Sequence, residues 1–225
     1  MKYFLTLLTI ATVALATGRT SAPSGCVTVG SGGTYSTIQS AVDSLSTTST
    51  TAQCLFIEPG TYSEQVLVSS RAAQLTIYGY TEDISTYSSN QVTITGSLSQ
   101  ADGLSNDETA TLRVKAANFK LYNVNVANTY GKGSQAVALS ASVDSGYYAC
   151  AFTGYQDTLL AQTGYQLYAG SMIEGVTDFI FGQYAAAWFE ACDIRVLAAS
   201  LGYVTGKWFT CCLYYRSGTR MGTEN

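Results

Sequence analysis

The chain contains no histidine, and this absence removes several kinds of catalytic site. A serine or cysteine nucleophile that is activated by an imidazole base cannot be built from it. Zinc and non-haem iron sites rely heavily on imidazole ligands and are disfavoured for the same reason. If the protein is an enzyme, its carboxylates, amides and aromatic side chains must carry the chemistry.

Charged residues are also scarce, at 12% of the chain, and the net charge is −4. Lysine and arginine form no basic patch, which argues against nucleic acid as a partner. Beyond the first residues, no apolar run is long enough to span a bilayer. Those first residues are typical of a secretory signal, with Lys2 before an apolar stretch and a small-x-small sequence at 14–16. We therefore expect a signal peptide at 1–16 and a secreted, monomeric protein with no membrane partner.

Proline is nearly absent, and helical periodicity is confined to one segment. Apolar residues at positions i, i+3, i+4 and i+7 predict a short helix within 35–45. The rest consists of short apolar runs separated by Gly, Asn and Ser, which predicts an all-β barrel, sandwich or β-helix. The predicted strands are 54–57, 65–68, 74–78, 91–95, 112–114, 119–122, 124–126, 136–139, 147–150, 166–168, 179–181 and 187–189.

Recurrence at intervals of about 21 residues favours the β-helix, because one turn of that fold uses a similar number. Residues one turn apart then stack about 4.8 Å from each other. Cys150, Ser171 and Cys192 would form such a column. The two thiols would be about 9–10 Å apart, too far for a disulfide, so we predict that both are free and face inward. The sequence leaves the pairing of Cys26 and Cys54 open.

A second column, of Gln135, Asp157 and Asp178, would place two carboxylates one strand spacing apart. Neighbouring carboxylates cannot easily both ionise, so one stays protonated as a general acid while the other acts as nucleophile or base. The amides of Gln135 and Gln156 are neutral donors that can stabilise an oxyanion. This set suits acyl transfer through an Asp nucleophile, and it also suits glycoside hydrolysis.

Four segments carry a resemblance to a known family. They read Gly-Thr-Tyr-Ser-Glu at 60–64, Gln-Ala-Val-Ala-Leu at 135–139, Gly-Tyr-Gln-Asp-Thr-Leu at 154–159 and Asp-Phe-Ile-Phe-Gly at 178–182. From about residue 27 to 205 the chain resembles the fungal pectinesterases, truncated before that family's C-terminal coils. The resemblance implies a right-handed single-stranded parallel β-helix that demethylates homogalacturonan. Plant cell-wall pectin is the implied partner, and no metal or cofactor is implied.

The resemblance also implies roles for individual residues. Asp178 matches the family's nucleophile, and Asp157 matches its general acid and base. Gln156 and Gln135 match the amides that stabilise the oxyanion. Phe181 matches an aromatic residue of the cleft that packs on a sugar face, although a position in the core would also explain it.

The chain departs from the family near its C-terminal end. The family's Leu-Gly-Arg-Pro-Trp segment, whose Arg pairs with the nucleophile, has no counterpart here, and Arg216 and Arg220 lack its context. From about Gly206 the sequence stops following the family. A single-base change of reading frame near codon 206 would restore the resemblance, and a mis-predicted intron would also explain the departure. We therefore expect a pectinesterase-like β-helix over 17–205 and an aberrant, disordered tail over 206–225.

Two other interpretations stay open. One is an inactive pectinesterase-like fragment that at most binds pectin. The other is a hydrolase or lyase that cleaves the pectin chain on the same kind of β-helix. Methanol release, new reducing ends and unsaturated products distinguish these activities.

Overall fold

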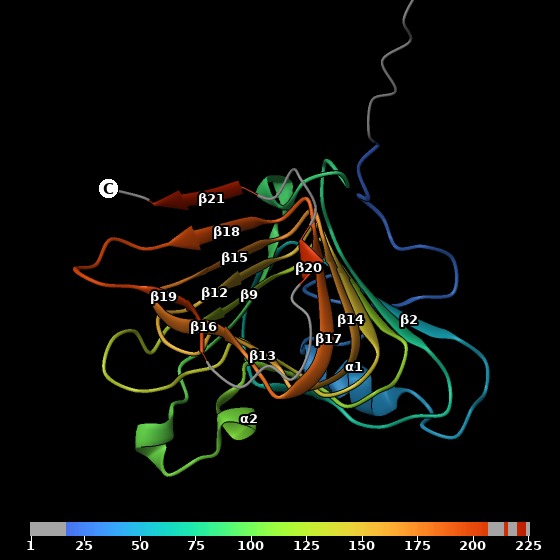
Figure 1. Cartoon of the computed structure of the whole chain (residues 1–225). Coiled ribbons are helices and arrows are strands. Elements are labelled where there is room, and N and C mark those ends of the chain that lie inside the picture. Colours follow the sequence, from blue (N-terminus) through green and yellow to red (C-terminus); the bar gives the residue numbers. More distant parts are fainter. Residues whose placement is uncertain (1–16, 207–213, 216–219, 224–225) are drawn as a thin grey trace, which may run out of the picture.

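The predicted all-β parallel β-helix is confirmed by a computed structural model that describes residues 17–206, 214–215 and 220–223. Figure 1 shows three sheets arranged around a shared interior. Every pairing between named strands is parallel, so each turn of the chain contributes one strand to each sheet in succession. Consecutive turns therefore place chemically equivalent positions side by side.

The sheets differ in their number of strands. The eight-stranded sheet holds β1 (Val27–Val29), β2 (Gln53–Ile57), β5 (Leu75–Gly79), β8 (Phe119–Tyr122), β11 (Ser145–Tyr148), β14 (Thr163–Ala169), β17 (Tyr184–Glu190) and β20 (Tyr214–Tyr215). The six-stranded sheet holds β4 (Val66–Val68), β7 (Leu112–Val114), β10 (Leu139–Ala141), β13 (Leu159–Ala161), β16 (Thr177–Phe181) and β19 (Tyr203–Thr205). The seven-stranded sheet holds β3 (Gly60–Ser63), β6 (Val92–Gly96), β9 (Asn125–Asn128), β12 (Ala151–Thr153), β15 (Met172–Gly175), β18 (Asp193–Val196) and β21 (Arg220–Thr223).

The helix predicted within 35–45 is present as α1 (Ile38–Ser44). Thr37 caps its first turn, and the Glu64 carboxylate accepts hydrogen bonds from the N–H groups of Ile38 and Gln39 at 2.8 and 2.9 Å. Three shorter helices were not predicted: η1 (Tyr87–Ser89), η2 (Gln100–Asp102) and α2 (Asn106–Thr109). Helices of three or four residues leave no periodicity to detect. None of the helices among the described residues has the length and apolarity needed to cross a membrane.

Stacked rings form part of the core under the eight-stranded sheet. Strand register places Tyr147 beside Tyr168 and Tyr168 beside Phe189, with ring centroids 4.9 and 4.8 Å apart. All three side chains are fully buried. The Tyr168 hydroxyl donates to Gln166 Oε1 at 2.7 Å, which offsets the cost of burying it. Repetition of similar side chains at one position thus builds the core turn by turn.

Four successive corners between the eight-stranded and seven-stranded sheets have the same two-residue form. The first residue has a left-handed backbone, with φ of 49° to 55°, at Asn123, Ala149, Gly170 and Ala191. The second residue is fully buried, at Val124, Cys150, Ser171 and Cys192. The predicted column of Cys150, Ser171 and Cys192 is therefore confirmed, and both of these thiols are free.

The buried thiols should be inert in the folded protein. Burial raises the pKa of Cys150 to about 12 and that of Cys192 to about 11, so almost no thiolate forms near neutral pH. We expect iodoacetamide at pH 8 to label both residues only after unfolding, as measured by peptide mass spectrometry. The same peptides from urea-unfolded protein serve as the positive control. Labelling at equal rates in folded and unfolded chains, or a Cys150–Cys192 disulfide, would contradict the inward column.

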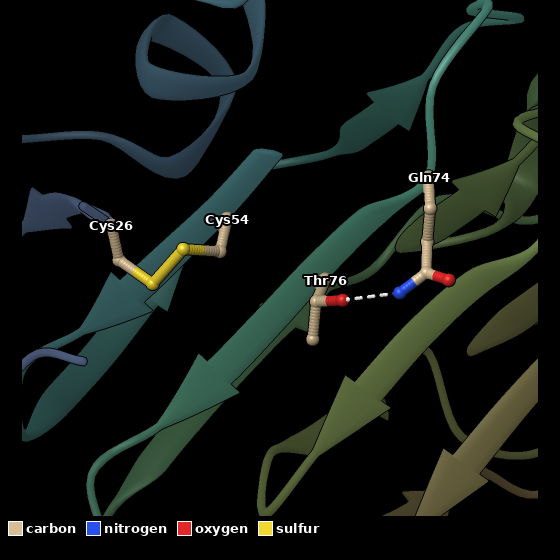
Figure 2. Close-up of a disulfide and its surroundings, with 4 residues drawn as sticks. All are labelled: Cys26, Cys54, Gln74 and Thr76. Atoms are coloured by element: carbon tan, nitrogen blue, oxygen red, sulfur yellow. Dashed lines mark hydrogen bonds between the residues drawn. A yellow bond between two sulfur atoms is a disulfide. The ribbon is translucent and has the colours of Figure 1, made fainter. Parts of the chain in front are cut away.

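A disulfide between Cys26 and Cys54 settles the pairing that the sequence left open. Figure 2 shows it joining the start of β1 to β2, next to a hydrogen bond of 3.0 Å from Gln74 Nε2 to Thr76 Oγ1 on β5. The two cysteines are 28 residues apart. A loop of that length restricts the unfolded chain and stabilises the fold by about 3–4 kcal/mol. The disulfide thus ties down the N-terminal turns.

The boundaries predicted at the two ends of the chain stay predictions. The expected signal peptide at 1–16 lies outside the described residues. Within the segment expected to be disordered, β20 pairs with β17 and β21 pairs with β18. The remaining tail residues lie outside the described part of the chain. The origin of the tail in a changed reading frame stays a prediction.

Candidate active site

Asp157 and Asp178 lie opposite each other on neighbouring strands of the six-stranded sheet. The N–H of Asp157 donates to Thr177 O at 3.0 Å, and Gln156 forms a β-bridge with Thr177. The same interval of 21 residues continues in β13 and β16, where Leu159 pairs with Ile180. The predicted stacking of the two aspartates is therefore confirmed.

Both aspartates adopt a left-handed backbone conformation, with φ of 64° at Asp157 and 47° at Asp178. This conformation costs a residue other than glycine roughly 1–2 kcal/mol. It interrupts the strand, since the register between β16 and β19 shifts between Thr177 and Ile180. Strain of this kind persists where the surrounding structure imposes it, and it concentrates at functional sites.

The two carboxyl groups of the pair differ in their exposure to solvent. Asp157 is only 7% exposed, whereas Asp178 is half-buried. Within residues 17–206 neither carboxylate has a hydrogen bond or an ion pair to compensate its charge. Burial, with a further contribution from the charge of Asp178, raises the pKa of Asp157 to about 7. Asp157 can therefore hold a proton near neutral pH, as a general acid must.

Gln135 lies one position away from its predicted place in the column. The N–H of Ala136 donates to Gln156 O at 3.1 Å, which aligns Ala136 with Asp157 and Gln135 with Gln156. The prediction failed because residues 129–138 form a connection between β9 and β10, where sequence interval does not report strand register. The amides of Gln135 and Gln156 have no side-chain hydrogen bond within residues 17–206, so both remain able to donate to a ligand.

Two hollows flank the aspartates along the strands. The first has a volume of about 400 Å³ and is lined by residues that include Lys132, Tyr155, Gln156, Thr177, Ser200 and Leu201. The second has a volume of about 260 Å³ and is lined by Asn106, Leu160, Gln162, Phe181, Gly182 and Gln183. Phe181 also packs against the small cluster of Ala110, Val137 and Leu160, so both of its predicted roles fit its position. The candidate site therefore has open space on both sides of the aspartate pair.

Asp107, in α2, holds this short helix on the outer face of the six-stranded sheet. Its carboxylate accepts hydrogen bonds from Arg113 Nη2 at 2.6 Å, Lys115 Nζ at 2.5 Å and Ser140 Oγ at 2.6 Å. Burial opposes ionisation, but the three donors outweigh it and lower the pKa of Asp107. Because Asn106 lines the second hollow, these contacts fix one wall of the site. This cluster could not be predicted from the sequence, because its members follow no shared repeat.

Replacement of Asp107 with Asn should loosen that wall. We expect the free energy of unfolding at pH 7 to fall by about 1–2 kcal/mol and hydrogen exchange to rise in residues 97–111. The pKa of Asp107 is lowered by folding, so its stabilisation is present above the ordinary pKa of aspartate and is lost as the pH falls. The difference in melting temperature between the parent chain and Asp107→Asn should therefore become smaller at acid pH. Exposed Glu82, changed to Gln, is the matched control, and an equal loss in both variants would contradict the assignment.

Asp178 also contacts Gly206, which directly follows β19. A Cβ atom on Gly206 would lie 2.6 Å from the Asp178 Cβ, so the Gly206 backbone packs directly on this side chain. Gly206 is buried, and its N–H donates to Ile180 O at 3.2 Å. Among the described residues, no three His, Cys, Asp or Glu side chains gather closely enough to hold a metal ion together.

Comparison with known proteins gives one consistent result. The family model described as Pectinesterase matches residues 26–203. The chain is 56% identical over 200 residues to a pectinesterase of Aspergillus niger, a match that covers 88% of this chain and 60% of that protein. It is 54% identical over 201 residues to a pectinesterase of Aspergillus aculeatus, which covers 88% and 61%. The chain thus spans about three fifths of the length of these relatives.

Solved structures agree with this result. The deglycosylated pectin methylesterase of Aspergillus niger superposes with a TM-score of 0.78 at 44% identity, covering 90% of this chain and 71% of that one. Pectin methylesterase from carrot superposes with a TM-score of 0.80 at 28% identity, covering 91% and 65%.

Proposed function

The chain belongs to the pectinesterase family, and from this premise we propose that it hydrolyses the methyl esters of homogalacturonan and releases methanol. The observation that carries the proposal is the stacked pair of Asp157 and Asp178, in which burial raises the pKa of Asp157 to about 7. A carboxylate and a carboxylic acid on neighbouring strands provide a nucleophile and a proton donor at one point.

Each residue of the pair has a defined task in this mechanism. The Asp178 carboxylate attacks the ester carbonyl carbon, and the amides of Gln156 and Gln135 donate hydrogen bonds to the oxyanion that forms. Asp157 gives its proton to the methoxy oxygen as the carbon–oxygen bond breaks, and methanol leaves. Asp157, now ionised, takes a proton from water, whose oxygen attacks the acyl-enzyme. The acid product leaves, Asp178 regains its carboxylate, and Asp157 is protonated again.

The two hollows supply room for the polymer on both sides of the scissile ester. Phe181, at the second hollow, offers an apolar surface on which a sugar ring can pack. The amide side chains of Gln162 and Gln183 in the same hollow are neutral hydrogen-bonding groups suited to sugar hydroxyls. We assign plant cell-wall pectin as the substrate on this basis.

We further propose that the protein is secreted and acts as a monomer. The Cys26–Cys54 disulfide supports an oxidising compartment, as does the signal-like sequence at 1–16. Because Gly206 packs on Asp178, we expect a change in the position of Gly206 to alter the position of the Asp178 carboxylate and hence the activity.

The test is methanol release from methyl-esterified pectin by the purified chain. Methanol without new reducing ends or unsaturated products supports the esterase. New reducing ends would indicate a chain hydrolase, and unsaturated products would indicate a lyase. Binding to pectin with no product of any kind would support the inactive fragment instead.

A further inference from the structure

A separate hollow lies on the outer face of the eight-stranded sheet, away from the aspartate pair on the six-stranded sheet. It has a volume of about 280 Å³. Its lining includes Gln74, Lys120, Asp144, Gly146, Tyr148 and Tyr165, which belong to or adjoin β5, β8, β11 and β14. None of these residues takes part in the proposed ester hydrolysis.

Three aligned residues form the floor of this hollow, and the central one is a glycine, which has no side chain. Strand register aligns Lys120, Gly146 and Leu167 on the outward side of β8, β11 and β14. A Cβ atom on Gly146 would lie 2.7 Å from the Tyr148 hydroxyl oxygen, so the tyrosine leans over the glycine. The Tyr148 ring is held from behind by Tyr122, with centroids 4.5 Å apart.

Tyr165 forms the other side of the hollow and is 77% exposed. Its backbone N–H donates to Asp144 Oδ1 at 2.8 Å, and this hydrogen bond holds the part of β14 that carries the ring. Exposing most of a tyrosine ring to water loses the stabilisation that its burial would give. Two aromatic rings with a narrow floor between them therefore provide faces on which the C–H groups of a pyranose ring can pack.

Lys120 gives the hollow its charge selectivity. Its ammonium group has no hydrogen bond or ion pair within residues 17–206. The Asp144 carboxylate at the rim already accepts the Tyr165 N–H through one oxygen. A cation without a partner beside two tyrosine rings suits a sugar that carries a carboxylate.

We infer that this hollow is a second carbohydrate-binding site, which takes a stretch of unesterified galacturonan. The identity of the polymer rests on the proposed function, whereas the preference for a uronate over a neutral sugar rests on Lys120. Demethylated stretches of the same pectin molecule would bind here while methylated stretches occupy the cleft. Simultaneous binding at two faces raises the effective concentration of substrate without any new contact in the cleft.

The test measures binding of an unesterified galacturonic acid decamer to the full chain by calorimetry, with a neutral β-1,4-galactan decamer as the comparison. We expect Tyr165→Ala and Lys120→Gln each to raise the Kd for the galacturonate about 3–10-fold. Lys120→Arg should restore binding. Tyr184→Ala is the matched control, because Tyr184 is 69% exposed on the next strand but does not line the hollow.

Three results would overturn the inference. One is an unchanged Kd in both Tyr165→Ala and Lys120→Gln with melting temperatures equal to that of the parent chain. Another is equal weakening by Tyr184→Ala, and the third is galactan binding as tight as galacturonate binding. The measurement needs no catalysis, so a chain that releases no methanol but binds the decamer through Tyr165 would refute only the proposed function.

Discussion

Asp178→Asn should abolish methanol release from methyl-esterified pectin, with a loss in kcat on the order of 10⁴-fold or more. An amide cannot form the acyl-enzyme, and no other carboxylate in the described residues lies opposite Asp157. Asparagine also tolerates the left-handed backbone found at this position, so the variant should fold. The loss should therefore appear in kcat, with little change in melting temperature.

Asp43→Asn provides the matched control, since Asp43 is exposed in α1 at the far end of the β-helix. A second readout does not depend on turnover. The charge of Asp178 contributes to the raised pKa of Asp157, so Asp178→Asn should lower that pKa, as measured by carbon NMR of labelled aspartate. Activity above about a tenth of the parent value would remove Asp178 from the nucleophile's role.

Asp157→Asn should slow the reaction by about 10²–10⁴-fold, which is the usual contribution of acid–base catalysis. The same change should stabilise the fold at neutral pH. Folding raises the pKa of Asp157 to about 7, so the contribution of this group to stability is largest below its unfolded pKa. That contribution is lost as the pH rises toward 7, because the buried carboxyl resists ionisation.

Stability and rate should therefore respond oppositely in this variant. We expect Asp157→Asn to raise the free energy of unfolding at pH 8 by on the order of 1–2 kcal/mol, after allowance for solvent screening. At pH 3–4 parent and variant should be nearly equal. Urea unfolding at both pH values provides the measurement, and a variant that is less stable than the parent at pH 8 would contradict a raised pKa of Asp157. In the parent chain, kcat should decline as the pH rises through about 7.

Regular spacing made part of the molecule predictable. The interval of 21 residues identified the column of Cys150, Ser171 and Cys192, and it paired Asp157 with Asp178, because these residues lie where consecutive turns have equal length. In a parallel β-helix, equal length fixes register, and register fixes which side chains meet. The stacking of Asp157 on Asp178 could therefore be found from sequence alone.

Features outside the regular turns could not be found in this way. Gln135 follows an irregular connection, so its register with Gln156 depends on contacts that no interval encodes. The same holds for the segment that contains Asp107. A third example is Tyr87, whose hydroxyl donates to Asp193 Oδ2 at 2.5 Å across a sequence separation of 106 residues. Irregular segments are placed by individual side-chain contacts, and those contacts become visible only in three dimensions.

The four repeated two-residue corners, such as Ala149–Cys150, give the connections between the eight-stranded and seven-stranded sheets a constant length and backbone shape. An extra residue at one of these four corners would push a buried side chain out of the core, so these corners cannot change in length. The opposite connections, from the seven-stranded to the six-stranded sheet, range from the single residue Val176 to the segment 97–111. Asp157 lies on that freely varying edge. Insertions in these connections can therefore change the surface around Asp157 without changing the register of the strands.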